Sequence, residues 1–350
     1  MRKLRKSIAV LIAAAVLLFA RTGYLIVRPG TAEDLSQFVT VDEDTNKEQG
    51  TFYLVTVSQQ RATPVLLCYA LLHPDVDLLP SSSVIPPQMK RQEYNELMQQ
   101  WMTESQNLAK VIALRRKGYE VPIRSDGVEV VEVEEDSPAK GLLIPEDVIV
   151  AVDGQPVYLA EELITKVQQR AIGDPVTLSV KRQGRQHEVE ITTTNHTELP
   201  ERAAIGVLIQ TLNWQPVLPL EIKIDAGKIS GPSAGLMFVL EIMNQLEERD
   251  LTAGHKIAGT GTINLQEEVG AIGGVRQKVK AAEKVGAEYF FVPRENYEEA
   301  REAAEKITLV PVSTLTEALL FLEDLTGEEE STNNYSLRRE IGQKTAKKAA

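Results

Sequence analysis

The stretch Gly231-Pro232-Ser233-Ala234-Gly235 joins two segments of different hydrophobic periodicity. Residues 220–225 alternate apolar and polar side chains, which is typical of a strand, whereas the apolar positions of residues 236–243 suit a helix. The glycines allow close approach of a substrate, and the first N–H groups of a helix have no internal partners. The pattern therefore predicts an oxyanion hole at the backbone of Ser233 and Ala234. The alternative is an ordinary capped helix after a Gly-Pro turn.

A second helix is predicted over residues 275–286, closed by Gly286, after Gly270-Ala271-Ile272-Gly273-Gly274. At 100° per residue, the buried stripe contains Val275, Val279 and Ala282, and Lys278 lies at its edge. The other basic residues of this helix point elsewhere: Arg276, Lys280 and Lys284.

Burial of Lys278 without a negative partner would lower the pKa of its amine. A neutral amine can take a proton from a serine hydroxyl, so Ser233 and Lys278 form a candidate dyad. The alternative for Lys278 is a side chain that extends along the apolar margin and keeps its ammonium group in water.

These motifs together resemble the proteolytic domain of Lon-type peptidases. The resemblance covers residues 199–326, an α/β domain, and includes Gly259-Thr260-Gly261-Thr262-Ile263 and Phe291-Val292-Pro293-x-x-Asn296. It implies Ser233 as the nucleophile, Lys278 as the general base, and Thr260 in support of the lysine, with Gly231 and Ala234 supporting the serine. Many ATP-dependent members have aspartate where this chain has Ser230.

Composition sets outer bounds on function. The chain has 350 residues, enough for two or three domains, and a net charge of −12, which argues against a nucleic-acid partner. Its one cysteine, Cys68, excludes an intrachain disulfide and is expected to be a small buried hydrophobe. No cofactor or metal is expected, because there is no phosphate-binding loop and the histidines lack metal-ligand spacing.

The N-terminus predicts a membrane anchor within residues 1–28. Four basic residues within positions 2–6 precede an apolar run over residues 7–20, and a second apolar segment follows at residues 24–27. Counting through to Val27 gives a full bilayer span, with the N-terminus cytoplasmic and the rest of the chain extracytoplasmic. A signal peptide cleaved after Ala20 is the rival interpretation, and a cytoplasmic enzyme is a third.

Residues 29–117 are predicted to contribute to the protease body. Residues 51–57 and 64–72 are expected to be strands, and a long helix is expected from residue 86 to Gly118. The tail over residues 327–350 is polar and predicted to be disordered.

Residues 118–196 predict a mainly β unit with one helix, and they resemble a bacterial PDZ domain. The resemblance rests on Ser137-Pro138-Ala139-x-Gly141-Leu142 and Asp147-Val148-Ile149-x-x-Val152-Asp153-Gly154, with Glu146 where the family usually has glycine. A PDZ fold implies binding of an extended peptide beside a helix.

The loop for the peptide's carboxylate is predicted at Gly118-Tyr119-Glu120-Val121. The helix that walls the groove is predicted over residues 159–171.

The sequence thus predicts a membrane-anchored, extracytoplasmic serine endopeptidase that works without ATP on peptides or unfolded segments. Homo-oligomers are possible, as in other Lon-type domains. One alternative is a catalytically silent PDZ scaffold or chaperone tethered to the membrane. Another is a Ser-Lys enzyme of signal-peptidase type, which the long separation between anchor and Ser233 disfavours.

Overall fold

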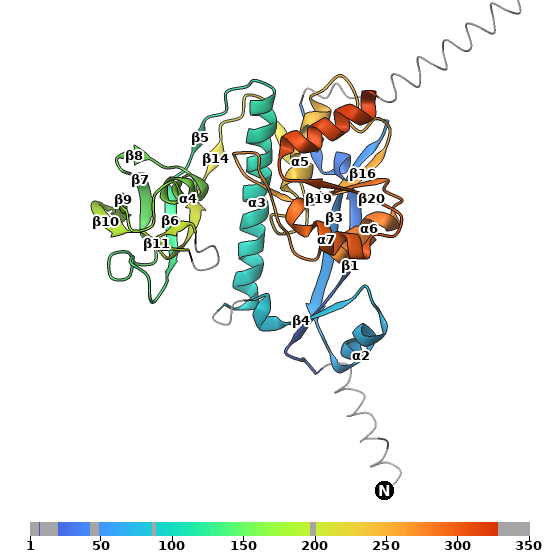
Figure 1. Ribbon diagram of the computed structural model, residues 1–350, viewed down its shortest axis with the longest axis horizontal. Helices are drawn as coiled ribbons and strands as arrows, with labels where there is room; N and C mark the ends of the chain where they lie inside the picture. Colours follow the sequence, from blue (N-terminus) through green and yellow to red (C-terminus); the bar gives the residue numbers. More distant parts are fainter. Residues whose placement is uncertain (1–6, 8–19, 43–48, 86–88, 197–200, 328–350) are drawn as a thin grey trace, which may run out of the picture. The chain divides into compact units, whose positions relative to one another are not determined.

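The computed structural model describes residue 7 and residues 20–42, 49–85, 89–196 and 201–327 (Figure 1). The chain divides into two compact units. The first unit combines Met1–Tyr119 with Leu220–Ala350, and the second unit is Glu120–Pro219. The second unit is therefore an insertion in the sequence of the first. The predicted tail beyond residue 327 lies outside the described residues.

The first unit is built on one mixed sheet. Within the described residues this sheet has six strands, in the order β20 (Thr308–Val312), β19 (Tyr289–Pro293), β16 (Lys256–Gly259), β3 (Thr51–Arg61), β1 (Tyr24–Asp34) and β4 (Asp77–Pro80). The strands from β20 to β3 pair in parallel, and β3, β1 and β4 pair antiparallel.

Helices cover both faces of this sheet. Ala258 of β16 packs with the core residues of α6 (Val275–Lys284) and α7 (Tyr297–Ala303). The next residue, Gly259, lies against Met237 of α5 (Gly235–Gln245), so α5 is on the opposite face. All residues of α5 are buried, because α3 (Arg91–Arg116) covers its outer side.

Short elements complete the first unit. Two small sheets pair β2 (Val39–Val41) with β15 (Ile222–Ile224), and β17 (Thr262–Ile263) with β18 (Val269–Gly270). The single 3-10 turns are η1 (Leu35–Gln37), η2 (Ser81–Ser83) and η3 (Arg294–Asn296), and residues 315–327 are helical.

The prediction of a strand over residues 64–72 is wrong, because this segment is helix α2 (Pro64–Leu72). Thr63 caps the helix by accepting a hydrogen bond from Leu66 N, and Pro64 occupies the first turn, where its missing N–H costs nothing. An apolar run without periodicity does not distinguish strand from helix. Cys68 lies on this helix and is exposed, contrary to the expected burial.

The predicted span that continues to Val27 is also wrong. Tyr24 begins strand β1, and Leu25, Ile26 and Val27 are buried in the sheet. No helix within the described ranges combines the length and apolar content of a bilayer span. Residues 8–19, the main part of the predicted anchor, lie outside the described residues.

The second unit is an antiparallel sheet with one helix. Its main strands run in the order β10 (Arg185–Thr192), β9 (Pro175–Arg182), β7 (Val148–Val152), β6 (Gly127–Val133) and β13 (Val207–Leu212), with β8 (Gln155–Pro156) on β7. Helix α4 (Ala160–Gln168) buries Leu163 and Val167 against the core of this sheet. Two-residue pairs join β5 (Ile123–Arg124) to β14 (Gln215–Pro216), and β11 (Thr194–Asn195) to β12 (Ala203–Ala204).

In this unit, strand β13 differs from what the sequence predicts, whereas the turn at Glu146 keeps a conformation typical of glycine. Strand β13 was assigned to the proteolytic domain, but it pairs with β6 and belongs to the second unit. Glu146, where glycine was expected, has a φ of 72°, so the turn keeps the left-handed conformation that glycine adopts most easily.

Candidate active site

The turn that carries Ser233 is held against helix α3. Gly231 has a φ of 94°, and its N–H donates to the carbonyl oxygen of Met98 at 2.9 Å. Two turns farther along α3, the hydroxyl of Ser105 donates to the carbonyl oxygen of Pro232 at 3.1 Å. These two contacts fix the backbone on the N-terminal side of Ser233 just before α5 begins.

Lys278 reaches Ser233 from α6. Its Nζ lies 2.8 Å from Ser233 Oγ and 3.1 Å from Thr260 Oγ1, and the residue is only 3% exposed. The neighbouring basic residues Arg276, Lys280 and Lys284 are not buried. The structure thus brings together Ser233, Lys278 and Thr260, which lie far apart in the sequence.

Thr260 determines which way the hydrogen bonds run. The carbonyl oxygen of Ser233 lies 2.9 Å from Thr260 Oγ1, and because a carbonyl only accepts, the threonine hydroxyl must donate to it. Thr260 Oγ1 can then only accept from an N–H of Lys278. When the amine is neutral, its lone pair is left for the hydroxyl of Ser233.

Burial lowers the pKa of Lys278 to about 7, from its ordinary value of 10.5. Desolvation is the cause, because a charged ammonium loses its hydration in this dry position. The position before Gly231 is Ser230, an exposed residue that lines the cleft and brings no carboxylate to the lysine. A substantial fraction of the amine is therefore neutral near pH 7.

The backbone beside Ser233 supplies two unengaged donors. Among the described residues, no partner accepts a hydrogen bond from the N–H of Ser233 or of Ala234. Both groups lie where α5 begins, so the helix dipole reinforces them as anion-binding donors. They are placed to stabilise negative charge that develops beside Ser233 Oγ.

Two hydrogen bonds from the side chain of Asn296 fix the loop that precedes α6. Gly274 has a φ of 69°, and the side chain of Asn296 accepts from Ile272 N at 2.8 Å and donates to Ile272 O at 3.1 Å. This pair of hydrogen bonds orients the loop that precedes the helix, and thereby the backbone from which the side chain of Lys278 extends. The motif residue Asn296 therefore has a structural role in the site.

A cleft of about 770 Å³ opens over the dyad, within the first unit. Its walls come from β1, β3, the serine turn and the first half of α3; apolar members include Leu54, Val57, Met98 and Met102. The size and shape suit several residues of an extended chain.

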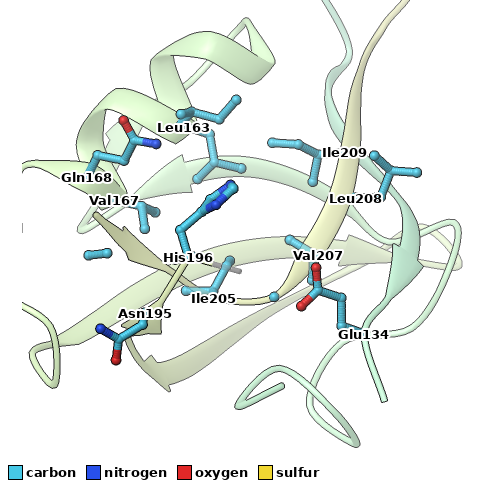
Figure 2. Close-up of a pocket in the computed structure, with 14 residues that line it drawn as sticks. Glu134, Leu163, Val167, Gln168, Asn195, His196, Ile205, Val207, Leu208 and Ile209 are labelled. Atoms are coloured by element: carbon cyan, nitrogen blue, oxygen red, sulfur yellow. The ribbon is translucent and has the colours of Figure 1, made fainter. Parts of the chain in front are cut away.

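The second unit has its own groove, between α4 and β13 (Figure 2). It is lined by apolar side chains of both elements, and Figure 2 shows His196 directed into the space between them. Strand β13 is at the edge of its sheet, so among the described residues no strand pairs with its outer side. Gly206 precedes β13 with a φ of 72°, and a Cβ there would approach Ser137 Cβ to 2.1 Å.

The structure does not bring the predicted carboxylate loop, residues 118–121, to this groove. The N–H groups of Gly118 and Tyr119 donate to carbonyls of Arg115 and Leu114, so they end helix α3 instead. The segment that leads into β13, residues 203–206, which includes β12, lines the groove in their place.

Sequence reasoning also missed the part that α3 plays. The predicted helix ending at Gly118 was given no role in the site, yet its residues Met98 and Ser105 both hold the serine turn. The only signal was the length of the predicted helix, which says nothing about its partner.

Comparison with known families agrees with this geometry. Residues 219–322 match the model of the Lon protease (S16) C-terminal proteolytic domain, and residues 104–193 match that of the PDZ domain. The chain combines a PDZ domain with a Lon-type proteolytic domain. The matched proteolytic domain is that of a serine peptidase, and it contains Ser233, Thr260 and Lys278.

Curated relatives match over the proteolytic part. A Lon protease of Mycoplasma mobile is 32% identical over 136 residues, which are 37% of this chain and 16% of the relative. Lon protease 2 of Bacillus subtilis is 34% identical over 114 residues, 32% of this chain and 20% of the relative. The chain therefore spans a fifth or less of these two relatives.

Among solved structures, the PDZ domain of an SdrC-like protein from Listeria innocua is 33% identical. The match covers 24% of this chain and 93% of that chain, with a TM-score of 0.23.

Proposed function

We propose that this chain is an endopeptidase, anchored in the membrane and active outside the cytoplasm, that cleaves extended peptide segments without ATP through Ser233 and Lys278. The observation that carries the proposal is the 2.8 Å contact between Lys278 Nζ and Ser233 Oγ in a buried site.

The proposed reaction follows from the hydrogen-bond directions in the site. Neutral Lys278 accepts the proton of the Ser233 hydroxyl as Ser233 Oγ attacks the peptide carbonyl. The N–H groups of Ser233 and Ala234 stabilise the oxyanion, and the ammonium form of Lys278 returns the proton to the leaving amine. A water, deprotonated by Lys278, then hydrolyses the acyl-enzyme and restores both residues.

The groove of the second unit supports a role in substrate selection. Strand β13 offers an open edge, and α4 supplies apolar side chains beside it, which together suit an extended peptide with an apolar end. We propose that the segment over residues 203–206 receives the peptide's carboxylate.

Sequence supports the proposed location and the independence from ATP. Four basic residues within positions 2–6, ahead of the apolar run over residues 7–20, favour a cytoplasmic N-terminus. No Gly-x-x-x-x-Gly-Lys-Ser/Thr motif occurs in the sequence, so a linked motor is not part of the proposal.

Cleavage of casein by the full chain in mild detergent, with and without ATP, tests the proposed function. We expect cleavage that ATP does not change, that Ser233→Ala abolishes and that the matched control Ser82→Ala, at an exposed serine that does not line the cleft, retains. Persistent cleavage by a pure Ser233→Ala sample would overturn the assignment. If no sample cleaves casein, a fluorophosphonate probe decides: labelling of Ser233 indicates a narrow-specificity enzyme, and its absence indicates a silent scaffold.

A further inference from the structure

Helix α2 has an apolar face on its outer side as well as on its inner side. The inner face, Leu66, Leu67 and Ala70, packs with Ile26, Ala62 and the strand β4 region. The outer side, which we call the α2 face, comprises Val65, Cys68, Tyr69, Leu71 and Leu72. Leu71 and Leu72 are 81% and 80% exposed.

The spacing of the α2 face makes it a continuous stripe. Positions 65, 68, 69 and 72 follow the i, i+3, i+4, i+7 pattern of one helical face. A helix exposed only to water carries polar residues at such positions, so a stripe of this kind marks an interaction surface. Two further exposed apolar residues, Tyr24 and Leu79, lie on the neighbouring strands β1 and β4.

Three arginines line an open hollow at the same end of the first unit: Arg21, Arg61 and Arg91. We call them the arginine cluster. Among the described residues, no carboxylate forms an ion pair with any of the three. The acidic residue closest in sequence to the end of α2, Asp75, interacts with Lys280 instead. The cluster is therefore an uncompensated positive site beside an apolar helix.

The path of the chain ties both features to the apolar N-terminal run. Arg61 is two residues before the cap of α2, and Thr22 N donates to Ala62 O at 3.1 Å. Residues 7–20 thus join the first unit next to α2. That run has 14 residues, and a helix of this length would measure about 21 Å, which is shorter than the bilayer core of about 30 Å. A run this short would bring the adjoining end of the first unit to the membrane surface.

We propose that the α2 face and the arginine cluster dock on an anionic phospholipid membrane. The apolar side chains enter the boundary between headgroups and acyl chains, Tyr69 lies at headgroup level, and the arginines bind lipid phosphates. This inference rests on the proposed membrane anchoring and adds a second contact to it. The consequence is that the proteolytic unit is held against the membrane rather than suspended from a flexible tether.

A lipid surface fits these features better than a second copy of the chain. The basic residues beside the apolar stripe complement anionic headgroups, whereas a second copy would present the same positive charge.

Cys68, the only cysteine in the sequence, allows a direct test. The full chain, labelled at Cys68 with an environment-sensitive fluorophore, is reconstituted in vesicles that contain phosphatidylglycerol and nitroxide-labelled lipid. We expect strong quenching of the label at Cys68. The control is a label at residue 248, introduced as Glu248→Cys in a Cys68→Ser background; this exposed position follows α5, which Figure 1 shows at the opposite end of the unit from α2.

Two double variants separate the contribution of the arginine cluster to membrane docking from that of the α2 face. Arg21→Gln with Arg61→Gln should lower the docking equilibrium constant about 25-fold, at about fivefold per arginine. The matched control is Arg185→Gln with Arg249→Gln, two exposed arginines outside the cluster, which should change nothing. Leu71→Gln with Leu72→Gln should also reduce quenching.

The outcomes distinguish this inference from the proposed anchoring. If the chain floats with the vesicles but the Cys68 label stays unquenched, anchoring stands and the docking surface is refuted. If the emission of the label at Cys68 shifts to shorter wavelength but the nitroxide-labelled lipid does not quench it, protein and not lipid covers α2. That outcome also refutes the docking surface. A chain that does not float with vesicles overturns both proposals.

Discussion

The two concave sites of this protein are built on opposite principles. The cleft over Ser233 gains its chemistry from polar groups removed from water: a lysine only 3% exposed, a threonine, and a serine brought together from three separate segments. The groove between α4 and β13 is lined by apolar side chains and has an open strand edge. Changes in the cleft should therefore abolish turnover, whereas changes in the groove should alter only which substrates are bound.

The largest effect is expected from Lys278→Met. This substitution removes the base but keeps the volume of the side chain, so kcat/KM should fall by about 10³-fold or more for every peptide. A peptidase assay on short and long substrates measures it. A loss of activity confined to long substrates would contradict the division of roles, in which the cleft performs the reaction and the groove selects the substrate.

The same variant should be more stable than the parent chain. Because the pKa of Lys278 is about 7 in the folded chain and 10.5 as its ordinary value, the unfolded chain binds more protons between these values. The cost of burying the amine is absent above pH 10.5 and complete below pH 7. The gain in the free energy of unfolding from Lys278→Met, measured by denaturant unfolding, should therefore be larger at pH 7 than at pH 10, and on the order of a few kcal/mol at pH 7.

Thr260→Val should have an intermediate effect. The lysine keeps its position near the serine but loses the acceptor that directs its lone pair, so we expect kcat to fall about 10- to 100-fold, by analogy with the hydrogen-bond partners of metal ligands, with little change in KM. Thr252→Val is the matched control, because Thr252 is also fully buried and bonds to Asp250 away from the dyad. Equal losses in the two variants would mean that Thr260 acts through stability alone.

These expectations show how far the sequence alone could go. Ser233 and Lys278 were predictable because each stands in a local pattern, a glycine-flanked turn and an apolar helical stripe. The contribution of α3 was not, because Met98 and Ser105 act through contacts with residues more than a hundred positions away. Local periodicity contains no information about such pairs.

The errors have equally physical causes. Residues 24–27 are as apolar in a buried strand as in a membrane span, and only their pairing with β3 and β4 distinguishes the two. A soluble form that begins at residue 29 would lose three core side chains of β1. Strand β13 pairs with β6, whose residues lie 74 to 85 positions earlier, from Val207 with Val133 to Leu212 with Gly127. Local periodicity does not reveal such a long-range pairing either.

A groove substitution should have a smaller and selective effect. Ile164 lines the groove and is 43% exposed, so Ile164→Asp should disturb peptide binding without disturbing the core. We expect KM to rise about tenfold, the effect of losing one apolar anchor, for substrates with an apolar C-terminus, with kcat unchanged. Ile172→Asp is the matched control, since Ile172 is equally exposed and is not among the groove residues. Equal responses would argue against the groove as a binding site.

The smallest effect is expected at Glu146, which lies in a left-handed turn of the second unit and is not among the residues that line either site. Glu146→Gly should raise the free energy of unfolding of that unit by about 1 kcal/mol, because glycine adopts this conformation without strain. Denaturant unfolding measures the gain. Peptidase activity should not change.

The pH dependence of Ser233 acylation tests the central claim most directly. The rate at which a fluorophosphonate labels Ser233 should rise with pH, reach half its plateau near pH 7, and fall to about 1% of the plateau at pH 5, because only neutral Lys278 accepts the serine proton. In Lys278→Met this titration should disappear along with most of the rate. A midpoint near the ordinary lysine value of 10.5, or an unchanged profile in Lys278→Met, would contradict the assignment of Lys278 as the base.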